Sequence, residues 1–302
     1  MTAQAHDTAT RTATAARPAR PARSARSARP PRRADARTVR LSQRDIDGLL
    51  LCGEHYGAPY DLLGLALRVA PDRLHPIVAR WRRAGYAETG RLGSGPGWCW
   101  LTRAGMTATG LGFPATEPSL GRLAHIRAVL AVRLWLAASP VWAAGRPWWH
   151  SERRLRADRP AAGRREHVPD AEIHWPSIEG SPYAGQVWAV EVELTPKPIA
   201  RTVRIMTWLL SPVRYAQVAY LTAPAARFGL TRAAGSLPAG EQPRVVIREL
   251  PSAACQIRNH PALASVDHRS HDPAVMPVLS PWRTACPGHF AGPGFTREAG
   301  AR

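Results

Sequence analysis

Lysine is almost missing from this 302-residue chain, because Lys197 is the only lysine among its 41 Lys and Arg residues. The abundance of Arg, Ala, Pro and Gly is typical of a high-GC coding sequence, in which lysine drifts to arginine. A lysine that persists indicates a place where a compact ammonium group is needed and a planar guanidinium would not serve. Chance survival is the alternative reading of Lys197.

Cysteine and long apolar runs are scarce as well. The longest apolar helix candidate, 120–139, is interrupted by Arg122, Arg127 and Arg133, so it does not predict a membrane span. The N-terminus lacks the apolar segment of a secretory signal. The cysteines are scattered without the spacing of a disulfide framework, which favours a reduced, cytoplasmic protein; they are Cys52, Cys99, Cys255 and Cys286.

Acidic residues are outnumbered, with 22 Asp and Glu, and the formal net charge is +19. This excess predicts a polyanionic partner, most simply nucleic acid, with an anionic membrane surface as the alternative. The chain has no phosphate-binding G-x-x-x-x-G-K-[ST] motif, which argues against a P-loop ATPase. It also lacks the His-hydrophobe-His triplet of rolling-circle relaxases.

Both ends of the chain are predicted to be disordered or irregular. Residues 1–40 contain ten arginines against two aspartates in Ala-Arg-Pro repeats, which suits a phosphate tether or simply a solvated tail. The tail, 251–302, is rich in Pro, Gly and His. A zinc site is a minor alternative there, because His268 and His271 share a pair spacing with Cys286 and His289.

Residues 41–112 read as three helices followed by two short β-runs around a Gly-rich tip. The helices are expected at 42–55, with Ser42 as its cap, at 59–67 and at about 71–84. A further helix starts at Thr102. In the third helix, Leu74, Ile77, Val78 and Trp81 recur at helical spacing and are expected to face the core.

The run "ARWRRAGYAE…WCWLTRAG" resembles the end of the recognition helix and the wing of a winged helix-turn-helix domain. The resemblance implies binding of double-stranded DNA, with the third helix in the major groove and the wing on adjacent phosphate. A winged helix used for protein contacts is the alternative. The candidate DNA-binding residues are Arg73, Arg80, Arg82, Arg83 and Arg91.

Residues 119–250 alternate helices with strands, which predicts an α/β domain. An apolar helix is expected at 120–138, and a helix capped by Thr195 with Pro196 in its first turn follows the acidic strand. Another helix is expected at 225–234. The strands are expected in "VPDAEIHW", "QVWAVEVEL", "RYAQVAYLTAP" and "PRVVIREL".

Carboxylates gather on two of these strands. Glu191 and Glu193 are two residues apart, so they share one face of a strand, and Asp170 on the preceding antiparallel strand can lie opposite them. Three such groups repel one another unless a cation neutralises them, and oxygen ligands suit Mg²⁺ or Mn²⁺. Lys197 is expected to orient water or steady a phosphate. An ordinary half-exposed β-hairpin is the alternative.

"HVPDAEIHW" and "VWAVEVELTPK", behind a winged helix, resemble the replication-relaxation family of plasmid and mobile-element proteins, with a PD-(D/E)XK nuclease-like domain. The resemblance covers about residues 41–250 and implies roles in plasmid replication and DNA relaxation, alongside replication proteins. Asp170 matches the motif's aspartate and Glu191 its second acid, which makes them the implied metal ligands. Glu193 stands where lysine is usual, and Glu152 is a further candidate acid.

The sequence therefore predicts an N-terminal winged helix-turn-helix followed by a PD-(D/E)XK-like α/β domain. Two functions stay open: a DNA-binding protein that nicks DNA with Mg²⁺ or Mn²⁺, and a non-enzymatic replication or transcription regulator on the same fold. The catalytic candidates are Asp170, Glu191, Glu193, Lys197 and Glu152.

Overall fold

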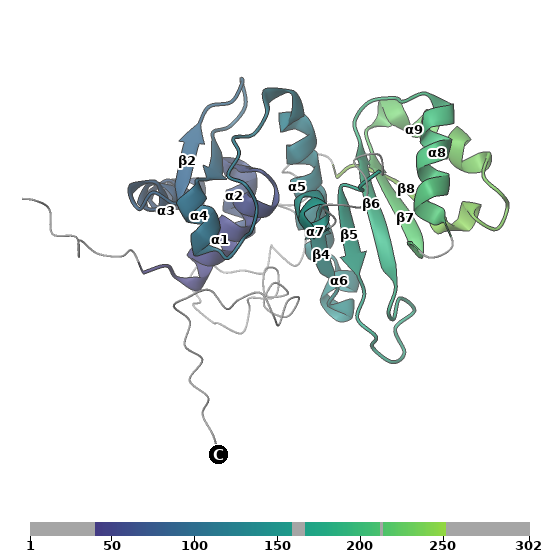
Figure 1. Ribbon diagram of the computed structural model, residues 1–302, viewed down its shortest axis with the longest axis horizontal. Coiled ribbons are helices and arrows are strands. Elements are labelled where there is room, and N and C mark those ends of the chain that lie inside the picture. The colour runs from purple at the N-terminus through teal and green to yellow at the C-terminus, as the bar shows by residue number, and fades with distance from the viewer. Residues whose placement is uncertain (1–39, 159–166, 212–213, 252–302) are drawn as a thin grey trace, which may run out of the picture. The chain divides into compact units, whose positions relative to one another are not determined.

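The computed structural model describes residues 40–158, 167–211 and 214–251 (Figure 1). These residues belong to one compact unit of mixed α/β structure. In them, no helix is long and apolar enough to cross a membrane. Cys52 and Cys99 are free thiols and buried. The predicted arm up to residue 39 and the tail from 252, with its candidate zinc ligands, lie outside the described residues.

The first half contains short helices and a small antiparallel sheet of order β1-β3-β2. Its elements are α1 (Gln43–Glu54), β1 (Ala58–Pro59), α2 (Tyr60–Leu67), α3 (Pro71–Arg83), β2 (Ala87–Gly90), β3 (Trp98–Leu101) and α4 (Arg103–Ala108).

Local sequence signals explain where these helices begin. Ser42 caps α1 in a reciprocal capping box with Asp45, so the predicted cap is confirmed. Thr102 caps α4, which confirms the helix start predicted there. Pro71 occupies the start of α3, where its missing N–H costs nothing. Leu74 and Trp81 of α3 are buried, and this apolar face fixes the helix against the core.

The second half is a five-stranded sheet of order β4-β5-β6-β7-β8. β4 (Trp148–Ser151), β5 (Ala171–His174) and β6 (Val187–Glu193) pair antiparallel, whereas β7 (Gln217–Thr222) and β8 (Val245–Glu249) continue parallel to β6. Helices α8 (Ile199–Leu210) and α9 (Pro224–Gly235) connect the parallel strands. The remaining elements are η1 (Leu120–Arg122), α5 (Leu123–Ala137), α6 (Pro140–Gly145), α7 (Glu152–Asp158) and η2 (Gln242–Arg244).

Helices cover both faces of this sheet (Figure 1). Val132 of α5 packs in one core with Ile173 and Val190, while Met206 of α8 packs in another with Ala189 and strand β7. β6 therefore presents its even-numbered residues to α5 and its odd-numbered residues to α8, as alternation along a strand requires. The acidic positions of β6 lie on the α8 side.

Two predicted boundaries near the acidic motif were wrong. Helix α8 begins at Ile199 with Pro198 at its cap position, so Thr195 is not the cap and Lys197 lies in the connection before the helix. The physical reason is Pro198, because a residue that precedes proline is pushed out of the helical region. Strand β5 begins only at Ala171, so Asp170 occupies the bend that precedes it.

Candidate functional site

The predicted acids come together at the junction of β5 and β6. Ala171 pairs with Val190 in the antiparallel register, which places Asp170 beside Glu191 in the adjoining positions. Glu191 and Glu193 are 5% and 7% exposed, so neither belongs to a solvated strand face. A buried carboxylate needs a partner, and the structure supplies one for each acid.

Asp170 is held from three directions. Its Oδ1 lies 2.8 Å from Nε2 of His125 on α5, and its Oδ2 accepts a 2.8 Å hydrogen bond from the backbone N–H of Val192. Its carbonyl oxygen accepts a 2.9 Å bond from the N–H of Glu152. The hydrogen bond to Asp170 raises the pKa of His125 against the opposing effect of burial. Asp170 therefore ties α5 and α7 to the edge of the β5–β6 pair.

Glu191 pairs with His167, whose Nε2 lies 2.6 Å from its Oε1. The pKa of Glu191 is raised to about 7, mainly by burial and also by the charge of Asp170, while His167 and Lys197 oppose the rise. Burial lowers the pKa of His167, but the hydrogen bond to Glu191 and the charges of Glu191 and Asp170 together outweigh it, and the net shift is upward. Close to neutral pH, a proton can thus lie on either member of this pair.

Lys197 pairs with Glu193, with 2.5 Å between Nζ and Oε2. Tyr220 of β7 stands next to Glu191 in the parallel register, and its hydroxyl is buried with no hydrogen-bond partner among the described residues. Burial raises the pKa of Tyr220, and the charges of Glu191, Glu193 and Asp170 add to the rise. Asp170, Glu191 and Glu193 therefore lie close enough to Tyr220 for their charges to affect the ionisation of its hydroxyl.

Glu152 opens α7 and forms ion pairs with Arg122 at 2.7 Å and with Arg156 at 2.8 Å. Glu152 and Asp170 both line a small cleft, together with Arg122 and His125. This cleft lies on the α5 side of Asp170. Glu152, the further candidate acid, and Asp170 thus share one cleft.

Each of the three acids of the motif has a basic side chain as its partner. The three basic partners His125, His167 and Lys197 each pair with one carboxylate. His167 stands three residues before Asp170, so its position beside the motif was a usable signal. His125 is on a helix 45 residues away, and nothing in the local sequence points to it.

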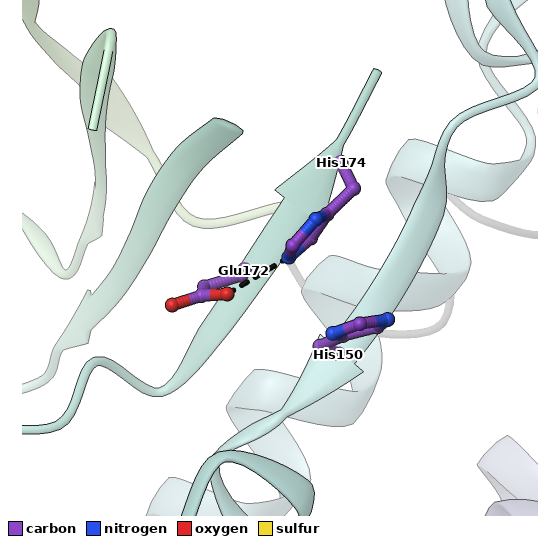
Figure 2. A group of neighbouring side chains, drawn as sticks. All are labelled: His150, Glu172 and His174. Atoms are coloured by element: carbon purple, nitrogen blue, oxygen red, sulfur yellow. Dashed lines mark hydrogen bonds and ion pairs between the residues drawn. The ribbon is translucent and has the colours of Figure 1, made fainter. Parts of the chain in front are cut away.

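A second cluster, which sequence reasoning missed, lies on β4 and β5. His150, Glu172 and His174 each place one potential ligand atom within 4.8 Å of the other two (Figure 2). Glu172 and His174 alternate along β5, and His150 stands directly opposite Glu172 on β4. The "E-x-H" alternation in "DAEIHW" was the available signal. In the described part of the chain, this is the one such group of three.

The candidate DNA-binding arginines have different surroundings. Arg82 and Arg83 are exposed and line an open hollow of about 980 Å³ beside the β2–β3 hairpin. Arg91, just after β2, is exposed, and the side chain of Arg73 is 81% exposed. Arg80 instead forms an ion pair with the buried Asp45, so its guanidinium helps to hold α3 against α1.

No family model, curated protein or solved structure matches this chain. The family resemblance noted in the sequence therefore stays a prediction.

Proposed function

We propose that this chain binds duplex DNA through its first half, with α3 as the helix that enters the major groove. The main observation in favour of this proposal is the exposed face of α3. Arg82 and Arg83 are exposed there, opposite the buried Leu74 and Trp81. A helix fits the major groove, and arginine reads guanine or binds phosphate from it.

The β2–β3 hairpin supports the same proposal. Its connection runs from Arg91 to Gly97 and is mostly exposed, and β2 is the first element after α3. This order of helices and strands is the one expected for a wing that lies on the backbone beside the groove. The net charge of +19 supplies the sequence-independent attraction to phosphate.

Fluorescence anisotropy of a labelled duplex tests the proposal. Arg82→Ala/Arg83→Ala should weaken binding about tenfold or more, as expected when arginines that contact DNA are lost. Arg201→Ala/Arg204→Ala is the matched control, because these exposed arginines lie on α8 and the variant loses the same charge. Equal weakening by both variants, or stronger competition by RNA than by duplex DNA, would contradict the proposal.

A second candidate function is metal-dependent cleavage of a phosphodiester. The position of Asp170 beside Glu191 favours it, because Ala171 pairs with Val190. The order α5, β4, β5, β6, α8, β7, with the short helices α6 and α7 on either side of β4, also favours it, because a PD-(D/E)XK domain is expected to have this order of main elements. The carboxylates of Asp170 and Glu191 are hard oxygen ligands that fit Mg²⁺ or Mn²⁺. To bind such an ion they would exchange the imidazoles of His125 and His167 for it.

A divalent cation held there would activate water and stabilise charge on the phosphodiester. The chain's own contribution would be the position of Asp170, fixed by the N–H of Val192, and the ammonium of Lys197, which can leave Glu193 for a phosphate oxygen. Glu193 would then take part as the partner that releases Lys197.

Nicking of supercoiled plasmid tests this second function. With Mg²⁺ or Mn²⁺ the protein should nick, EDTA should stop the reaction, and Asp170→Asn should abolish it while DNA affinity is kept. Glu179→Gln, in an exposed loop, is the matched acid control and should nick normally. Tight DNA binding without nicking under either metal would leave the non-enzymatic regulator as the function.

A further inference from the structure

We propose that His150, Glu172 and His174 bind one divalent transition-metal ion, with Zn²⁺ as the expected ion. The cluster is separate from the carboxylates proposed for cleavage, because neither Asp170 nor Glu191 belongs to it. Two strands supply its three ligands, and β4 is the edge strand of the sheet. The proposal does not depend on the DNA-binding or nuclease function.

The geometry needs little adjustment. The three ligand atoms already lie within 4.8 Å of one another, and the imidazole rings of His150 and His174 are 4.2 Å apart between centroids. Zinc–ligand bonds of about 2.0–2.1 Å in a tetrahedral site place neighbouring ligand atoms about 3.3 Å apart. Rotation of side chains is enough to reach that spacing, with the strand backbones unchanged.

His150 has a free electron pair to offer. Its Nε2 is buried and has no hydrogen-bond partner within the described ranges, which is a costly state for a polar atom. His150 also offers one of the three ligand atoms of the cluster, so a metal ion bound there through Nε2 would give this atom the partner that it lacks.

Glu172 and His174 are already oriented toward the same point (Figure 2). Tyr215 donates a 2.5 Å hydrogen bond to Oε1 of Glu172, while Oε2 lies 2.8 Å from Nε2 of His174. Trp148 stacks on the His174 ring, with 17° between the planes. Such outer contacts fix ligand orientation in metal sites and raise affinity.

The donor set decides the class of ion. Two imidazoles with one carboxylate suit zinc and related borderline metals, whereas Mg²⁺ prefers oxygen ligands alone. Three protein ligands leave a fourth position for water or another ligand. The side chain of His174 is 25% exposed, so that position has access to solvent.

Isothermal titration of the chelator-stripped full chain with Zn²⁺, in excess Mg²⁺, tests the site. The wild type should bind, and His150→Gln and Glu172→Gln should each lose one equivalent. Tyr215→Phe keeps the packed ring and should weaken zinc binding by about 10–100-fold, as loss of an outer-contact donor does. His75→Gln, an exposed histidine on α3, should bind as the wild type does.

The tail histidines and cysteine need their own control. Cys286→Ser/His289→Gln should retain the zinc equivalent that His150→Gln loses. The proposal is overturned if only the tail variant loses zinc, if the folded wild type binds none, or if Tyr215→Phe and His150→Gln both bind like the wild type. Circular dichroism of each stripped variant separates loss of ligand from loss of fold.

Discussion

His55 and Arg133 are two basic side chains that form a buried hydrogen-bonded pair. They are 4% and 3% exposed, and Nε2 of His55 accepts a hydrogen bond from Nη1 of Arg133. Burial lowers the pKa of His55 well below its usual value, and the charge of Arg133 lowers it further. Burial also lowers the pKa of Arg133 to about 9, although the charge of Glu54 opposes this. His55 must therefore stay neutral to accept from a cation.

The pair predicts a pH-dependent stability. The folded pKa of His55 is depressed below 6.5, so the unfolded chain binds the proton first and stability is lost as pH falls below 6.5. Between about pH 7.5 and about pH 5.5, the wild type should lose about 1.4 kcal/mol more than His55→Gln. Urea unfolding at both values measures this difference. His75→Gln should keep the wild-type slope, and equal slopes for His55→Gln would contradict the assignment.

Helix α5 contributes to two cores. Leu130 and Leu134 pack with the helices of the first half, while Val129 and Val132 pack against the five-stranded sheet. A helix buried on opposite sides is apolar over most of its circumference, which explains why its sequence shows no clear amphipathic stripe. The element predicted to open a separate second domain is therefore shared by both halves.

Leu130→Ala tests this role of α5. Leu130 is fully buried, so its truncation should cost about 2–5 kcal/mol in the free energy of unfolding. The rate of amide hydrogen exchange should rise in both α1 and β6, because residues of α5 pack in both cores. Leu120→Ala, at a residue that is 69% exposed, should leave exchange unchanged. Faster exchange confined to one half would contradict the shared core.

The sequence predicted elements whose signals are local. Ser42 and Thr102 mark helix starts because a cap contacts only residues in its own first turn. Asp170 also lies beside Glu191 as expected, because the antiparallel hairpin pairs Ala171 with Val190. The partners His125 and His150 were missed because their contacts depend on the register and packing of distant elements.

At the scale of the whole molecule, buried and half-buried ion pairs join the two halves. Glu54 of α1 pairs with Arg154 of α7 at 2.7 Å, and Asp61 of α2 pairs with Arg127 of α5 at 2.5 Å. Arg153 donates a 2.7 Å hydrogen bond to the carbonyl of Gly53. Arg127, Arg153 and Arg154 are thus engaged in contacts within the protein, whereas Arg82 and Arg83 are exposed.

The salt dependence of DNA binding is the most direct test of the proposed function, because only arginines that contact phosphate contribute to it. Each phosphate neutralised by arginine contributes about 0.9 to the slope of log K against log salt. If Arg82 and Arg83 contact phosphate, Arg82→Ala/Arg83→Ala should reduce the slope by about 1.8, and Arg201→Ala/Arg204→Ala should leave it unchanged. An unchanged slope with unchanged affinity in the α3 variant, or the same reduction of the slope in both variants, would contradict DNA binding through α3.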